Sequence, residues 1–211
     1  YSREGPALAV GDVNGDRQDD LYIGGAKGHA GELVLSSGGK WQPSPTPVFE
    51  ADATSEDVGA AFFDADGDGD LDLYVASGGY EFEPNDAALS DRLYLNDGKG
   101  NFKKTLNALP DLKISSACAK PADADGDGDL DVFVGGMIVP QRFPQTPGSY
   151  LLQNDGEGHF EAIAVPTTGL VKDATWTDVD GDQQLELVVA GEWMPVQVFR
   201  FREQKAVEIT T

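Results

Sequence analysis

The chain has 211 residues, of which 40% are hydrophobic and 25% charged, and this composition excludes a disordered, collagen-like or membrane-spanning chain. Its 15 basic and 37 acidic residues give a net charge of −22, which argues against nucleic acids and anionic membrane surfaces as partners and favours cations. Cys118 is the only cysteine, so an intrachain disulfide is excluded, and the chain has only two histidines from which a catalytic triad could be assembled.

An acidic segment of nine residues repeats four times along the chain and contains 18 of the 37 acidic residues. The copies align without gaps at residues 12–20, 64–72, 123–131 and 178–186, so their starts lie 52, 59 and 55 residues apart. A period of this length is too long for one pair of helices and is typical of a four-stranded sheet.

Each copy predicts four strands in the same order around its acidic segment. A short apolar strand precedes the segment, at residues 7–10, 58–63, 116–121 and 172–177. A β-branched and aromatic strand follows it and ends at one or two glycines, at residues 21–23, 71–76, 130–134 and 185–190.

The sequence predicts that the last two strands of a copy form a β-hairpin. Its Asp-Gly turn is present at 93–102 and 151–160 and degenerate at 33–41, whereas the fourth copy has only strand-like runs at 196–201 and 206–209.

These patterns predict an all-β fold of four antiparallel, four-stranded β-propeller blades. The expected blade boundaries are 5–50, 56–106, 114–164 and 170–211 within a single β-propeller segment. A β-sandwich with acidic turns is the alternative, and the regular repetition of the same unit argues against it.

The acidic segments have the residue pattern of calcium loops. Counted from the first Asp, side-chain oxygens stand at positions 1, 3, 5 and 9, position 4 is glycine, and position 7 can add a backbone carbonyl. The candidate metal ligands are Asp12, Asn14, Asp16, Gln18 and Asp20; Asp64, Asp66, Asp68, Asp70 and Asp72; Asp123, Asp125, Asp127, Asp129 and Asp131; and Asp178, Asp180, Asp182, Gln184 and Glu186. Oxygen ligands without histidine or cysteine, in a flexible loop, favour Ca²⁺ over zinc, copper and Mg²⁺, so we expect up to four calcium ions.

Two alternatives bear on these loops. The EF-hand pattern is excluded, because its bidentate Glu at position 12 is replaced here by Ile or Val within an expected strand. Exposed acidic turns without metal remain possible, although several carboxylates held together repel one another unless a cation or protons intervene. We expect the second and third loops to bind more tightly, because the first has neutral Asn14 and also Asp19, and the fourth ends in the longer Glu186.

The segment 58–79 resembles the FG-GAP repeat of integrin α-chain propellers, and the segment 93–102 resembles the related VCBS repeats, which also occur in relatives of cartilage acidic protein that carry an ASPIC/UnbV domain. The resemblance covers essentially the whole chain and departs at Asp19 and at the missing fourth hairpin. It implies a seven-bladed ring, structural calcium between the first two strands of a blade, and an extracellular, secreted or cell-surface location.

Four blades fall short of seven and the chain begins with Tyr1, so we expect it to be part of a longer protein. A closed four-bladed ring is the alternative. An open arc would expose sheet edges and apolar faces, through which two chains could associate.

The long loops that follow the second strands, at 78–91 and 135–149, are the expected binding surface. The candidate ligand-binding residues are Tyr80, Phe82, Phe143 and Trp193, although aromatic residues here could equally fill the gaps between blades. We therefore expect a calcium-stabilised binding or adhesion module for a protein or glycan, without catalytic residues. The alternatives are a non-catalytic scaffold of a larger secreted polysaccharide-active enzyme and a structural spacer.

Overall fold

The computed structural model describes residues 6–202 and 204–210, and these residues form four antiparallel sheets of four strands each. The first two sheets contain β1 (Leu8–Gly11), β2 (Asp20–Ile23), β3 (Glu32–Ser37) and β4 (Lys40–Ser44), then β5 (Asp57–Phe63), β6 (Asp72–Ser77), β7 (Arg92–Asn96) and β8 (Phe102–Lys104). The last two contain β9 (Ser115–Ala122), β10 (Asp131–Ile138), β11 (Ser149–Asn154) and β12 (Phe160–Val165), then β13 (Leu170–Thr177), β14 (Glu186–Glu192), β15 (Gln197–Arg202) and β16 (Lys205–Glu208).

Within each sheet the strands pair in chain order, which is the up-and-down arrangement of a propeller blade. The predicted all-β fold of four four-stranded blades is therefore confirmed. Helix is confined to two short pieces among the described residues, α1 (Pro47–Glu50) and the 3-10 helix η1 (Ala87–Leu89), both in connections between strands.

The Gly-Gly pair does not end the second strand of the third blade, contrary to the sequence prediction. β10 continues through Gly135 and Gly136 to Ile138, and its pairing with β9 shifts register at these two glycines. Glycine accommodates such irregular pairing because it lacks a Cβ, so the strand passes through the pair instead of stopping before it.

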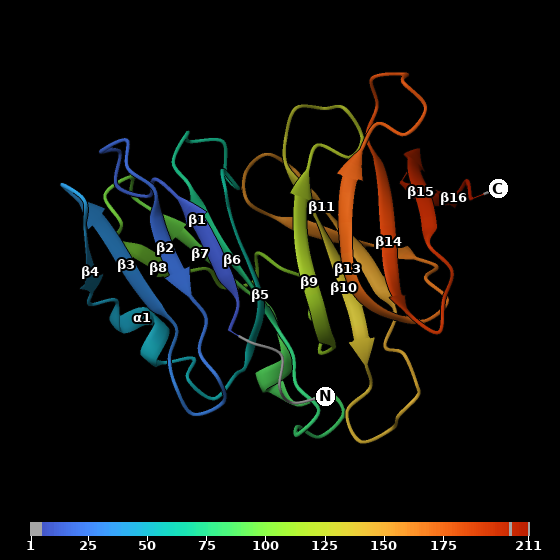
Figure 1. Cartoon of the computed structure of the whole chain (residues 1–211), viewed down its shortest axis with the longest axis horizontal. Helices are drawn as coiled ribbons and strands as arrows, with labels where there is room; N and C mark the ends of the chain where they lie inside the picture. The colour runs from blue at the N-terminus through green and yellow to red at the C-terminus, as the bar shows by residue number, and fades with distance from the viewer. Residues whose placement is uncertain (1–5, 203, 211) are drawn as a thin grey trace.

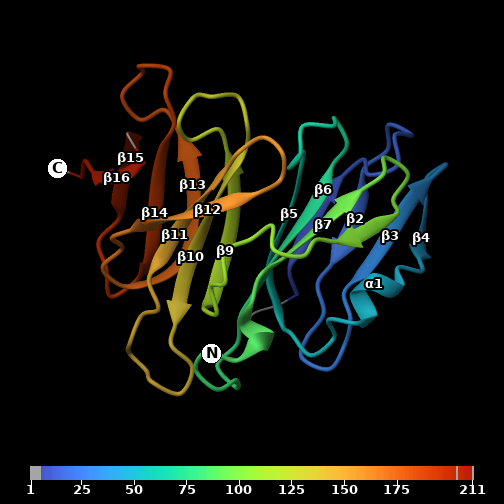
Figure 2. The ribbon, with the colours of Figure 1, turned by 180° about the vertical axis from the view of Figure 1, so that it is seen from behind.

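The four blades lie side by side in chain order and form an arc (Figures 1 and 2). The first strand of each blade contacts the first strand of the next, from β1 to β5, β5 to β9 and β9 to β13. Both views place β4 and β16 at opposite ends of the molecule, so the described residues form an open arc and not a closed four-bladed ring.

The apolar core consists of the interfaces between adjacent blades. Tyr22 and Leu33 of the first blade pack in one cluster with Leu73 and Tyr94 of the second. Corresponding clusters join the second blade to the third and the third to the fourth. Each blade is therefore stabilised mainly by its neighbours, as expected for units that are too small to bury a core alone.

The outer face of the first blade is exposed. Ala9 of β1 is buried against the second blade, whereas Leu8 and Val10 on the opposite side of the same strand are each 60% exposed. In the fourth blade Ala206 packs inward and Val207 is exposed. Both ends of the arc thus present apolar side chains, as the expectation of an open arc requires.

A buried ion pair of the second blade, which also binds the first blade, lies at the end of the sheets that carries the long loops. The Asp57 carboxylate lies 2.7 Å from the Arg92 guanidinium, and the two side chains are only 3% and 5% exposed. Asp57 also accepts hydrogen bonds of 2.7 Å from the Tyr22 hydroxyl and from the Gly25 amide of the first blade. These bonds satisfy a charge that would otherwise be costly to bury.

Candidate functional site

Each acidic segment forms the connection between the first two strands of its blade, and the four loops share one backbone geometry. The position-4 glycines adopt left-handed φ angles of 75° to 84°, which only glycine adopts without strain. Their amides donate to the position-1 carboxylates over 2.7 to 2.8 Å, in the pairs Gly15–Asp12, Gly67–Asp64, Gly126–Asp123 and Gly181–Asp178.

The acidic residue at position 9 is buried in all four loops. Asp20, Asp72, Asp131 and Glu186 are at most 1% exposed. One oxygen of each accepts the amide of position 2, as Asp72 does from Ala65 over 2.9 Å. In the first three blades the other oxygen accepts an amide of the third strand, as Asp72 does from Asn96 over 2.8 Å. This carboxylate therefore ties the loop to the rest of its blade.

Burial raises the pKa of two of these position-9 carboxyl groups far above the ordinary range. Loss of solvation on burial raises the pKa of Asp72 to about 7 and that of Asp131 to about 6, although backbone hydrogen bonds act in the opposite direction. Loss of solvation also raises the pKa of Asp66. Negative charge at these positions is therefore unfavourable unless a proton or a cation compensates it.

Three of the four loops bring carboxylate oxygens within 4.8 Å of one another among the described residues. The groups are Asp64, Asp66 and Asp72; Asp123, Asp125 and Asp127; and Asp178, Asp180 and Glu186. The first loop forms no such group of three, because the neutral amide of Asn14 takes the place of a carboxylate at position 3. The other predicted ligands lie in the same loops but outside these groups of three.

Two of the side chains at position 7, those of Asp70 and Asp129, point toward the hairpin of their own blade. A Cβ atom at Gly98 would come within 2.5 Å of an Asp70 carboxylate oxygen, and one at Gly156 equally close to Asp129. The side chains of Asp70 and Asp129 thus lie against the hairpins, whereas Gln18 donates to the Asp16 carboxylate over 3.2 Å within the first loop. A backbone carbonyl of position 7 as a metal ligand stays a prediction.

The second loop fits a cation on its own geometry. The Oδ1 atom of Asp66 is buried and has no hydrogen-bond partner, although it lies in the group with Asp64 and Asp72. A buried carboxylate oxygen without a donor is unfavourable, and a bound cation would satisfy it. The donors are all oxygen atoms, which suits a hard cation such as Ca²⁺.

The hairpin of each middle blade holds the acidic loop of the preceding blade, a contact that the sequence analysis missed. The Asn96 side-chain amide donates to the Val13 carbonyl of the first loop over 2.8 Å, and Asn154 donates to the Ala65 carbonyl of the second over 2.9 Å. The Asn-Asp-Gly sequence was interpreted only as a turn signal. Its Asn also links neighbouring blades, and this link depends on tertiary register.

The predicted aromatic ligand-binding residues lie in two different environments. Phe82 is 3% exposed, and the Lys27 ammonium lies 4.3 Å from its ring centroid. Tyr80 packs against a buried cluster that includes Met137. The burial of Phe82 and the packing of Tyr80 favour the alternative that these two residues fill gaps in the core and do not contact a ligand directly.

Phe143 and Trp193, in contrast, form an exposed aromatic pair. Their side chains are 40% and 66% exposed, and their ring centroids lie 4.9 Å apart with an interplanar angle of 65°. Phe143 follows β10 and Trp193 follows β14, so the pair joins the third and fourth blades at the end opposite the acidic loops. Trp193 also has a positive φ of 59°, which is unusual for a bulky residue.

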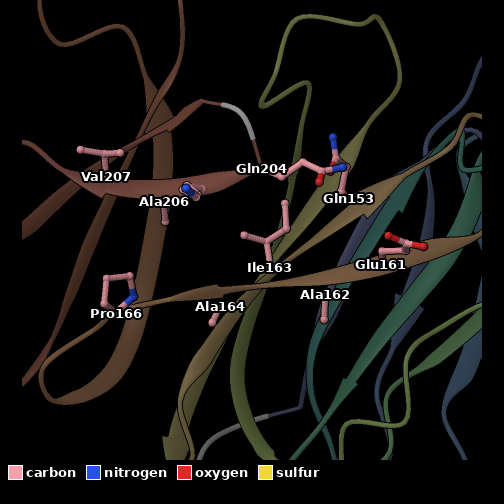
Figure 3. Close-up of a pocket in the computed structure, with 10 residues that line it drawn as sticks. Gln153, Glu161, Ala162, Ile163, Ala164, Pro166, Gln204, Ala206 and Val207 are labelled. Atoms are coloured by element: carbon pink, nitrogen blue, oxygen red, sulfur yellow. The ribbon is translucent and has the colours of Figure 1, made fainter.

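A separate groove of about 610 Å³ lies between the outermost strands of the third and fourth blades, β12 and β16 (Figure 3). Ile163 and Glu161 of one strand face it together with Ala206 of the other. None of the predicted site residues lines this groove, and its lining is largely aliphatic.

Comparison with known families identifies the repeat. Residues 12–75 and 82–134 match the model of the FG-GAP-like repeat, and the two matches together cover more than half of the chain. The chain belongs to the FG-GAP-like repeat family. The first match begins at the first acidic loop, and the two matches include the first three loops of this FG-GAP-like protein. None of the curated proteins that were compared matches it.

A β-propeller lectin from Agrocybe aegerita is similar in fold to the FG-GAP-like chain. The two structures align with a TM-score of 0.58 and 19% sequence identity, over 95% of this chain and 51% of the lectin chain. The FG-GAP-like chain thus spans about half the length of that lectin, which is described by its specific recognition of non-reducing terminal N-acetylglucosamine. At this identity the likeness supports the propeller fold.

The described part of the FG-GAP-like chain contains no helix of the length and apolar character needed to cross a membrane.

Proposed function

We propose that the chain is a calcium-stabilised binding module that works outside the cell. The observation that carries the metal assignment is the second loop, where Asp64, Asp66 and Asp72 place oxygens together and Asp66 Oδ1 has no other partner. A single divalent cation would satisfy that oxygen and offset the repulsion among the three carboxylates. A free calcium concentration near millimolar, as outside cells, suits such exposed loops.

Calcium would have a structural role in this proposal. In the second loop Asp64, Asp66, Asp68 and Asp72 would hold the ion, with the Asp70 carbonyl, and the ion would supply positive charge. The Asp72 carboxylate already connects the loop to β6 and β7. Bound calcium would therefore strengthen a blade whose opposite end carries the long loops.

We further propose that the Phe143–Trp193 pair is the contact surface for a protein or a glycan. Two exposed aromatic rings on adjacent blades offer a rigid surface, and such rings commonly provide contact area at binding sites. The β-propeller fold and the FG-GAP-like repeat fit a non-catalytic binding module. A glycan ligand has the additional support that the structurally similar lectin is described by sugar recognition.

A glycan array tests this surface directly. We expect binding by the unmodified chain in calcium and loss of binding in the Phe143→Ala/Trp193→Ala double variant. Trp41→Ala is the matched control, because Trp41 is 52% exposed on β4 of the first blade and far from the pair. Glycan binding that survives the double substitution would contradict the proposed contact surface.

A further inference from the structure

The fourth acidic loop contains a positively charged side chain from its own blade. Arg200 of β15 places Nη2 2.7 Å from Asp180 and 3.4 Å from Asp182, and the same guanidinium binds Glu186, with Nε 2.7 Å from its oxygen. One guanidinium therefore contacts the acidic residues at positions 3, 5 and 9 of the loop. These are the positions whose side chains would otherwise coordinate a metal ion.

The same position of the third strand carries a different residue in each of the other blades. The equivalent position is found from the strand register. In the fourth blade, Leu187 is the first residue after the loop and pairs with Phe199, and Arg200 is the next residue after Phe199. The same rule gives the equivalent position in the other blades. The equivalent residues in the first three blades are Leu35, Leu95 and Gln153. Arginine occurs here only in the fourth blade.

The loops differ as these side chains predict. In the second blade the equivalent residue is Leu95, which cannot donate a hydrogen bond, and Asp66 of the loop keeps a buried oxygen without a partner. In the third loop the neutral Gln153 amide donates to Asp125. Among the described residues, only the fourth loop's carboxylates receive a full positive charge from a side chain.

Glu186 completes this arrangement in the fourth loop. In the first three blades the shorter Asp at position 9 accepts amides from position 2 and from the third strand. Glu186 accepts the Val179 amide over 3.0 Å with one oxygen and binds Arg200 with the other. The additional methylene of Glu lets the carboxylate reach the guanidinium. The bond from Arg200 to Glu186 thus takes the place of the third-strand amide bond that Asp accepts in the other blades.

A guanidinium and a calcium ion cannot both contact these oxygens, because the two cations would repel each other at short range. We propose that Arg200 takes the place of calcium in the fourth loop, so that this loop is held together without metal. The proposal rests on the proposed calcium binding of the other loops. It implies no more than three bound ions, where the sequence alone predicts up to four.

Calcium stoichiometry, measured by isothermal titration calorimetry on the 211-residue chain, tests this proposal. Asp66→Asn in the second loop is expected to lower the number of bound ions by one, whereas Asp180→Asn in the fourth is expected to leave it unchanged. Arg200→Leu, which introduces the residue type of Leu95, is expected to raise the number by one.

The unfolding temperature provides a second readout. Arg200→Leu is expected to lower it in EGTA, because three acidic side chains lose their positive partner, and calcium is expected to restore it. Loss of one ion in Asp180→Asn would show that the fourth loop binds calcium and would overturn the role of Arg200. Absence of bound calcium from every variant would instead overturn the calcium proposal itself.

Discussion

At the scale of single residues, the four acidic loops have the same backbone but different partners. Asp66 has an unpartnered buried oxygen, Asp125 meets the amide of Gln153, and Asp180 meets Arg200. The sequence predicted four loops with graded affinity from their own nine residues. The deciding side chains, Arg200 and Gln153, lie on the third strand, 14 and 22 residues after the last residue of their loops, and only the sheet register brings them there.

Sequence reasoning could not separate the aromatic candidates either. Phe82 and Phe143 both lie in long loops after a second strand, yet Phe82 is 3% and Phe143 40% exposed. The difference in exposure depends on which residues of other segments cover each ring, and the hydrophobic pattern of a loop does not predict those contacts. The pairing of Phe143 with Trp193 needs the contact between two blades that are about 50 residues apart in sequence.

Asp91 gives a prediction for pH. Its carboxylate accepts hydrogen bonds from the Tyr74 hydroxyl over 2.6 Å and from the Ser77 amide over 2.7 Å, and burial raises its pKa to about 6. The folded state therefore holds this proton more tightly than the unfolded state, whose pKa is 3.8. The contribution of protonated Asp91 to the stability of the folded state is fully present below pH 3.8 and is lost as the pH rises through about 6.

We expect Asp91→Asn to remove this part of the pH dependence. Between pH 4 and 6, the difference in unfolding free energy between the unmodified chain and the variant should change by roughly 2 to 3 kcal/mol. Urea unfolding at a series of pH values, at constant saturating calcium, measures it. A difference that stays constant over this range would contradict the raised pKa.

At the scale of elements, most strands were predictable because each has a regular apolar pattern with nearby turn residues. The first strands, predicted at 58–63 and 116–121, are observed as Asp57–Phe63 and Ser115–Ala122. The links between blades were not predictable, since Asn154 was interpreted as part of a turn and its amide in fact binds the second acidic loop. A pattern within one hairpin contains no information about the neighbouring blade.

Asn154→Ala tests this link between blades. It should lower the unfolding free energy by about 2 kcal/mol, because the buried carbonyl group of Ala65 and the partly buried one of Leu130 would lose their donor. Asn101→Ala is the control, since the Asn101 amide bonds only the exposed Asp97 carboxylate of its own hairpin and should cost less than about 0.5 kcal/mol. Equal effects of the two substitutions in urea unfolding would contradict the link.

The buried Asp57–Arg92 pair of the second blade, whose Asp57 also binds Tyr22 of the first blade, gives a second prediction for stability. Arg92→Met would leave the Asp57 charge buried without its cation, and we expect a loss of about 3 to 5 kcal/mol. The double variant Asp57→Asn/Arg92→Met removes both charges and should be more stable than the single variant. Chemical denaturation of both proteins checks the order, and a double variant that is less stable than Arg92→Met would contradict it.

At the scale of the whole molecule, the blades form an open arc whose apolar core lies between them. The repeat period predicted the number of blades, because each acidic loop marks one blade. Closure was not predictable from four repeats, and the structure excludes the closed four-bladed ring for the described residues. Leu8 and Val10 at one end and Val207 at the other remain exposed, so further blades or a second chain could cover these faces.

We propose that calcium in the acidic loops stabilises the arc, and a comparison of the unfolding temperature with and without calcium tests this proposal. In about 1 mM calcium the temperature should rise by several degrees over that in EGTA, since a site saturated at 100 times its Kd contributes about 2.7 kcal/mol. The same concentration of magnesium should have a smaller effect. Identical unfolding temperatures in calcium and in EGTA would contradict the account.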